Sequence, residues 1–166
     1  MNRTIGIAAL GFAIAIGGCA SNRPDTGAVA EEVKGYCAQR LGDDRINPVR
    51  NKILIPLTIG EPQPIEMLAN RTYPTDEERA AIHALSEAQN ACQTFASRRM
   101  GPPPSYRSSS QDRIAASLSE LYAGEITYGE FARSMLFIGA RDQAAREDLE
   151  QAMQARQRWM EIDAAN

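Results

Sequence analysis

The side chains with the most versatile chemistry in this sequence are three cysteines and a single histidine. The cysteines are Cys19, Cys37 and Cys92, and the histidine is His83. A hydrolytic triad needs an imidazole between a nucleophile and a carboxylate, and a metal site needs several ligands at short, regular spacing. Neither pattern surrounds His83, so we interpret it as a surface or boundary residue of a helix. We expect no catalytic residue, no metal and no other cofactor.

Groups of neighbouring carboxylates are the second feature with catalytic potential, because glycoside hydrolases use two acidic side chains. Three groups are present: Asp43-Asp44, Glu77-Glu78 and Glu147-Asp148-Glu150. Helix capping explains Glu77 and Glu78, and the third group lies beside Arg146 on a charged helix side. Such charge runs are usually solvated faces, so glycoside cleavage is not the favoured interpretation.

The charge of the chain argues against a nucleic-acid partner but leaves open the binding of a small anion. The net charge is −3 and the pI is about 5.3, which argues against a nucleic-acid-binding protein with a basic surface. Four arginines flank a Pro- and Ser-rich stretch and could bind an anion such as a lipid phosphate: Arg98, Arg99, Arg107 and Arg113. A solvated loop with charge compensation at a helix end is the favoured explanation.

The first eighteen residues have the three-part layout of a secretory signal. Arg3 supplies a positive charge, an apolar run extends from Thr4 to Ile16, and the small residues Gly17 and Gly18 follow. The run is too short to cross roughly 30 Å of hydrocarbon, which takes about 20 residues. We therefore expect these residues to be a targeting signal and not part of the fold.

The four residues Ile16-Gly17-Gly18-Cys19 resemble the bacterial lipobox, in which an aliphatic and two small residues precede an invariant cysteine. The resemblance implies that residues 1–18 are a cleaved lipoprotein signal peptide and that Cys19 is lipidated. N-terminal acyl chains would then anchor the protein to a membrane. Ala20 stands where an aspartate would retain the protein in the inner membrane, which implies the periplasmic face of the outer membrane in a Gram-negative host. An ordinary signal with an unrelated cysteine is the alternative.

Two cysteines remain once Cys19 is assigned to the lipid anchor. An even pair in an oxidising compartment is most simply a disulfide, here between Cys37 and Cys92. Each also falls on the apolar side of a predicted helix, where packing would bring the two together. A pair of buried, reduced thiols is the alternative interpretation.

Composition and periodicity predict an all-α protein. Aromatic residues make up only 6% of the chain and alanine is abundant, a mix that favours helices over strands. We expect a flexible tether over residues 19–27 and a single helical domain over residues 28–166. The predicted architecture is a small bundle of about four helices with a Pro-rich extended segment and a long C-terminal helix.

Capping signals and glycine or proline stops give the expected helix boundaries. Thr75 with Glu78, and Thr127 with Glu130, match the capping box that starts a helix. The predicted segments are a helix to residue 41, an extended stretch over 53–59, a short helix at 64–68, and helices over 75–100, 110–123 and from 128 onward.

The predicted C-terminal helix is unusually long, since no proline follows Pro104. Its first half is apolar enough to pack on the preceding helix, whereas few apolar segments remain to cover its second half. Tryptophan is typical of binding hot spots, and this second half retains Leu149, Met153, Trp159, Met160 and Ile162. We predict a surface for an envelope protein partner or for self-association. The alternative is ordinary core, folded back on Val29, Val33 and Tyr36.

Short motifs spread over residues 48–131 resemble small exported proteobacterial proteins of unknown role. They are Pro48-Val49-Arg50-Asn51-Lys52, Met67-Leu68-Ala69-Asn70, Pro74-Thr75-Asp76-Glu77-Glu78 with the later Cys92, and residues 121–131. The resemblance implies no activity, and it supports one folded unit over residues 37–131.

The sequence thus favours a non-enzymatic, lipid-anchored envelope protein that acts as a helical protein-binding or scaffold module. Two alternatives remain open, an envelope enzyme acting on peptidoglycan and a periplasmic inhibitor or ligand-binding module. An enzyme should have a cleft with converging acids. A scaffold should have an exposed apolar stripe on its long helix.

Overall fold

The computed structural model describes residues 26–57 and 61–164. Within these ranges all regular structure is helical, which confirms the predicted all-α fold. The predicted signal peptide, Cys19 and all but the last two residues of the predicted tether lie outside the described residues. The elements are α1 (Thr26–Leu41), the 3₁₀ helix η1 (Asp44–Val49), α2 (Ile65–Leu68), α3 (Asp76–Met100), α4 (Ser105–Ala123) and α5 (Tyr128–Ala164).

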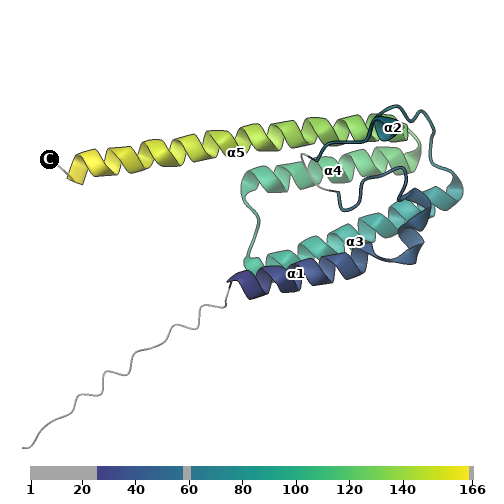
Figure 1. The fold of residues 1–166 in the computed structure, drawn as a ribbon, viewed down its shortest axis with the longest axis horizontal. Coiled ribbons are helices and arrows are strands. Elements are labelled where there is room, and N and C mark those ends of the chain that lie inside the picture. The colour runs from purple at the N-terminus through teal and green to yellow at the C-terminus, as the bar shows by residue number, and fades with distance from the viewer. Residues whose placement is uncertain (1–25, 58–60, 165–166) are drawn as a thin grey trace, which may run out of the picture.

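Two pairs of long helices make up the bundle (Figure 1). Helix α1 packs along α3, and α4 packs along the first half of α5, while α3 also contacts α4. The short element η1 packs on α3, and α2 packs on α5. Helix α4 therefore lies between α5 and the α1–α3 pair, and the second half of α5 extends past the bundle (Figure 1).

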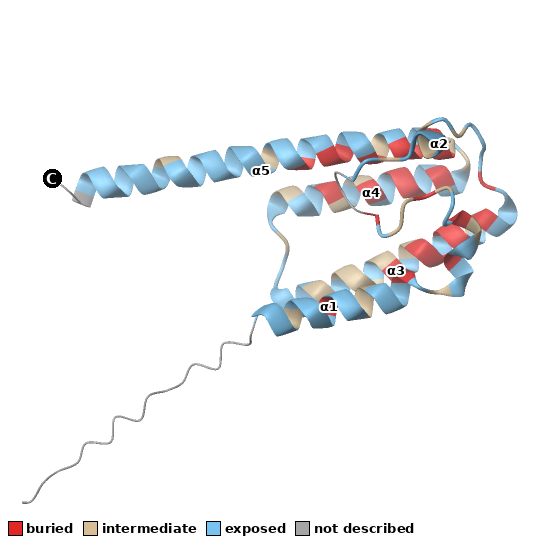
Figure 2. Ribbon diagram, viewed as in Figure 1, coloured by how far each residue is buried: buried red, intermediate tan, exposed pale blue. Residues whose placement is uncertain are grey.

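The hydrophobic core lies in the halves of α3, α4 and α5 nearest the turn between α4 and α5 (Figure 2). Here the helical spacing of apolar residues turns one face of each helix inward, and burial of those side chains is the main stabilising term. The largest fully buried side chains are Tyr128, Phe131, Ile46, Ile53, Ile82, Leu85, Leu121 and Val49.

Both predicted capping boxes are present and fix where α3 and α5 begin. Thr75 Oγ1 accepts from the Glu78 backbone N–H at 3.3 Å, and the Glu78 carboxylate accepts from the Thr75 N–H at 3.0 Å. Thr127 and Glu130 exchange the same two bonds at 2.7 and 3.3 Å. Gly124 ends α4 with φ of 75°, a left-handed conformation that glycine adopts without strain.

The start of α4 differs from the prediction, because the helix begins at Ser105 and not at Ser110. The linker is therefore only the proline run that ends at Pro104. Serines compete with helix formation by bonding nearby backbone, but inside a helix the same hydroxyl can reach the carbonyl four residues back. Ser110 Oγ lies 3.1 Å from the Tyr106 carbonyl oxygen in this way. The polar Ser-rich stretch is thus compatible with a helix.

Residues 53–57 of the predicted extended segment form no helix and contain bends at Ile53, Ile55 and Pro56, while residues 58–59 lie outside the described residues. Ile53 and Leu57 are buried in the core. A polar contact fastens the chain just before this segment, since Lys52 Nζ lies 2.5 Å from Glu78 Oε1. Lys52 also lies 4.8 Å from the ring centroid of the fully buried Tyr128. The contact joins the segment after η1 to the first turn of α3 and to the start of α5.

Candidate functional site

Cys37 of α1 and Cys92 of α3 form a disulfide, with their Cα atoms 5.0 Å apart. The predicted pairing is confirmed, and the alternative of two reduced thiols is wrong. Only Val33 and Leu41 of α1 are buried, so apolar packing alone holds this helix weakly. The disulfide is reinforced by stacking of Tyr36 on Phe95, with ring centroids 4.2 Å apart.

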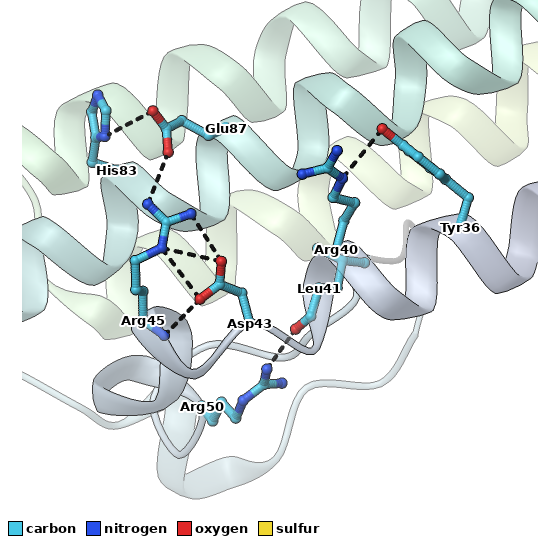
Figure 3. A network of polar contacts seen from close by, with 8 residues as sticks. All are labelled: Tyr36, Arg40, Leu41, Asp43, Arg45, Arg50, His83 and Glu87. Atoms are coloured by element: carbon cyan, nitrogen blue, oxygen red, sulfur yellow. Dashed lines mark hydrogen bonds and ion pairs between the residues drawn. The ribbon is translucent and has the colours of Figure 1, made fainter.

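A network of charged side chains joins α1, η1 and α3 on the surface (Figure 3). His83 Nδ1 lies 3.8 Å from Glu87 Oε1, and Arg45 bridges Glu87 at 3.4 Å and Asp43 at 2.8 Å. Arg50 donates to the Leu41 carbonyl at 2.5 Å, which ties the end of α1 to the turn after η1. His83 is exposed, as predicted, and Glu87 four residues on is a partner that helical spacing alone could have identified.

The structure distributes the paired carboxylates over three separate elements. Asp43 caps η1, and its hydrogen bond from Arg45 holds the pKa of this carboxyl below its usual range. Burial would raise the pKa of Glu78, but bonds from Lys52 and the Thr75 N–H outweigh it and lower that pKa. A glycosidase acid needs a raised pKa, so neither carboxyl has the property that this role requires.

No metal-binding cluster is found in the part of the chain that the structure describes, where no three His, Cys, Asp or Glu side chains are placed to hold an ion. The four arginines near the proline run also have separate surroundings. Arg99 pairs with Glu32 of α1. Arg107 lines a cleft of 470 Å³ together with Pro104, Asp142 and Arg146. Of these four arginines, Arg107 alone lines this cleft, so the four do not form one anion-binding site there.

The first and second halves of α5 have opposite surroundings (Figure 2). The first half buries one face, from Tyr128 to Ile138, against the rest of the bundle. The last buried position is Asp142, which accepts a hydrogen bond from Ser110 of α4 at 2.9 Å. We call residues 146–164 the arm; it is roughly 28 Å long at about 1.5 Å per residue.

The arm continues the same apolar face that α5 uses inside the bundle. At about 100° per residue, positions 149, 153 and 160 fall on one line with positions 135 and 142. Leu149, Met153 and Met160 occupy this line and are exposed, and Trp159 beside them is 73% exposed. The arm thus continues the face of α5 that α4 covers in the first half of the helix. Among the described residues, no helix covers this face along the arm.

The alternative that the arm folds back on α1 is wrong. Tyr36 of α1 stacks on Phe95 of α3, and Val33 belongs to the face of α1 that packs there. Helix α4 separates this pair from α5 (Figure 1). The sequence analysis predicted an exposed apolar stripe on the second half of α5. In the structure these apolar side chains are exposed.

Comparisons of the chain with protein-family models, with curated proteins and with solved structures gave no match. Among the described helices, none combines the length and apolar character that crossing a membrane requires. A role for this chain therefore has to be inferred from its own residues.

Proposed function

We propose that this protein is a non-enzymatic, lipid-anchored envelope lipoprotein whose helical bundle presents the arm of α5 to a protein partner. The observation that carries the proposal is the exposed row of Leu149, Met153 and Met160, with Trp159 at its side. A soluble monomer gains nothing from holding large apolar side chains in water, and contiguous exposed apolar surface usually marks an interaction site. Tryptophan and methionine are also enriched at interfaces.

The arm suits one mode of recognition, in which an amphipathic helix contacts another helix or enters an apolar groove. Its apolar row recurs at spacings of four and seven residues, and charged, glutamine and alanine side chains make up most of the remaining surface. The anchoring part of the proposal depends on the lipobox-like residues that end at Cys19. An anchor of several acyl chains would keep the bundle at the outer membrane, on its periplasmic face.

Truncation of the chain after Ala145 tests the arm. We expect the thermal midpoint of unfolding to stay within about 2 °C of the full chain, because little of the arm is buried. Co-purification from native membranes should lose the envelope partner. A large loss of stability would show that the arm is core, and retention of every partner would remove the binding proposal.

Point variants separate the apolar row from the opposite side of the arm. Met153→Glu with Met160→Glu places two charges on the row and should abolish capture of the partner. The matched control is Gln151→Glu with Gln154→Glu, which adds the same charge away from the row and should leave capture unchanged. Equal effects of the two pairs would argue against a specific surface.

Labelled fatty acid tests the anchor independently of the arm. Wild type should incorporate the label and Cys19→Ala should not, since Cys19 would supply the thioether sulfur. Equal incorporation by the two proteins would contradict lipidation at this residue.

A further inference from the structure

The cleft of 470 Å³ lies between the second half of α3 and the first half of α4, at the end of the bundle opposite the turn between α4 and α5 (Figure 1). Sites for small ligands usually have volumes of roughly 300–1,000 Å³. The described residues that line this cleft are apolar, neutral polar or positively charged, with a single carboxylate. The cleft is therefore large enough for a small ligand, and its lining indicates the chemistry of that ligand.

Two arginines come together at one end of the cleft. The bond from Ser110 to Asp142 sets the antiparallel α4 and α5 side by side at these positions. Arg107 precedes Ser110 by about one turn, and Arg146 follows Asp142 by about one turn, so both lie at the same level of the bundle. Both line the cleft.

The one carboxylate of the cleft is already bonded. Asp142 accepts from Ser110 at 2.9 Å and from Arg146 at 3.3 Å, and it is buried. The side chain of Arg107 has no hydrogen-bond or ion-pair partner among the described residues. Two positive charges therefore share one carboxylate, and this excess favours a ligand that brings an anionic group to the arginines.

Three half-buried glutamines line the same cleft: Gln89 and Gln93, one turn apart on α3, and Gln111 on α4. Their side-chain amides form no hydrogen bond with any other described residue. A glutamine amide has one acceptor oxygen and two donor hydrogens. The three amides therefore suit a ligand that both donates and accepts hydrogen bonds, as the backbone of a peptide does.

The cleft also offers apolar surface. Two of its lining residues, Leu57 and Ile114, are apolar and buried, and Pro102 and Pro103 form part of its wall. Proline fixes its own backbone angle, so this wall is already formed and needs little ordering when a ligand binds. An apolar side chain of the ligand would be buried against these residues.

From these observations we propose that the cleft binds the carboxyl-terminal end of a short peptide whose last residue is apolar. The free carboxylate would bond to Arg107 and Arg146, which is a known mode of peptide capture by arginine. The peptide backbone would bond to the glutamines, and the last side chain would contact Leu57 and Ile114. The cleft lies apart from the apolar row of the arm, so this inference does not depend on the proposed partner of the arm.

A matched pair of peptides tests the carboxylate. The full chain carrying Cys19→Ala is purified in detergent and titrated against the tripeptide Ala-Ala-Leu, labelled with a fluorophore at its amino end, as the free acid and as the carboxyl-terminal amide. Fluorescence anisotropy should show that the acid binds about tenfold more tightly than the amide, because only the acid carries the charge that the arginines face. Equal affinities, or no binding of either peptide at millimolar concentration, would overturn the proposal.

A charge variant locates the site. Arg107→Gln changes an exposed side chain and should lower the affinity for the acid about tenfold, to that of the amide, while the affinity for the amide stays the same. Arg113→Gln removes the same charge from the same helix outside the cleft and should leave both affinities unchanged. An equal loss in the two variants would show a general attraction between charges and would overturn the proposed site.

The peptide character of the ligand needs its own test. Gln93→Met with Gln111→Met keeps the length of the side chains but removes two amides, so it should weaken the acid and the amide peptide about equally. Octanoate, which has a carboxylate and an apolar chain but no amide, should compete only weakly with the labelled acid. Unchanged binding by the double variant, or competition by octanoate as strong as that of the unlabelled peptide, would overturn the assignment to a peptide.

Discussion

Ser110 of α4 donates a hydrogen bond to Asp142 of α5 at 2.9 Å, and this contact joins the first buried residue of α4 to the last buried residue of α5. The other carboxylate oxygen of Asp142 accepts from Arg146 at 3.3 Å. Both oxygens of a carboxylate that is only 4% exposed are thus satisfied. The buried contact between α4 and α5 therefore ends on this polar pair, which we call the polar lock, and the arm begins one helical turn later.

Removal of this carboxylate should destabilise the bundle. We expect Asp142→Ala to lower the free energy of unfolding by about 1–3 kcal/mol, because the buried hydrogen bond between Ser110 and Asp142 and the contact of Asp142 with Arg146 are both lost. Denaturant unfolding followed by circular dichroism measures the change. Asp148→Ala on the exposed arm is the matched control and should stay within about 0.5 kcal/mol of wild type. A similar cost for both variants would contradict the lock.

The Cys37–Cys92 disulfide should contribute strongly to stability, since the two residues are 55 positions apart. Closing a loop of this size restricts the unfolded chain by about 4 kcal/mol on chain-entropy grounds. Cys37→Ser, Cys92→Ser and the double variant should therefore lose similar amounts of stability. Two reactive thiols in denatured, unreduced protein, counted in a Cys19→Ala background, would show that the bond is absent.

Acid should weaken the contact between Lys52 and Glu78. The lowered pKa of Glu78 means that its contribution to stability is present above its ordinary value of 4.5 and is lost as the pH falls through the folded-state pKa. Glu78→Gln should cost about 2 kcal/mol near neutral pH, where Lys52 loses its charged partner.

The pH dependence of that cost distinguishes the ion pair from simple packing. The difference between wild type and Glu78→Gln should shrink in acid, when wild-type Glu78 is itself protonated. Glu77→Gln, one residue earlier and exposed, is the control and should show a much smaller difference. A cost that is constant down to acid pH would mean that the charge of Glu78 is not responsible.

Gly129 lies where the segment after α2 touches the start of α5. A Cβ atom at this position would stand 2.5 Å from the Asn70 carbonyl oxygen and 2.7 Å from that of Leu68. Gly129→Ala should therefore lower the thermal midpoint and cost about 1–3 kcal/mol. In contrast, Gly35→Ala meets nothing within 4 Å on exposed α1 and should stabilise the helix by about 0.5–1 kcal/mol. Stabilisation by both changes would show that the close contact is absent.

Local signals in the sequence predict much of this fold. The capping pair Thr75 and Glu78 needs only residues three apart, so the start of α3 is predicted correctly. The Cys37–Cys92 pair follows from the small number of cysteines together with their helical faces. The exposed row on α5 follows from counting the apolar segments available to cover it.

Contacts between distant residues were not predictable in the same way. Asp142 interrupts the apolar spacing of α5 in the sequence, yet the structure buries it against Ser110, a residue 32 positions away. Ser110 also ends the Ser-rich stretch that the sequence analysis assigned to a loop, whereas the structure places this stretch in α4. Lys52 and Glu78 also meet only after the extended segment packs, and no local spacing relates them.

The position of the disulfide has a mechanical consequence. A pull on the N-terminus would travel through the first turns of α1 to Cys37 and cross a covalent bond to Cys92 of α3. Tension would bypass the chain between these two residues, which contains η1, the extended segment and the first turns of α3. These parts are held by non-covalent contacts, such as those of Ile46 and Ile53 in the core. The bond therefore carries force applied at the N-terminus of α1 directly to α3, and the segments between Cys37 and Cys92 are not pulled apart first.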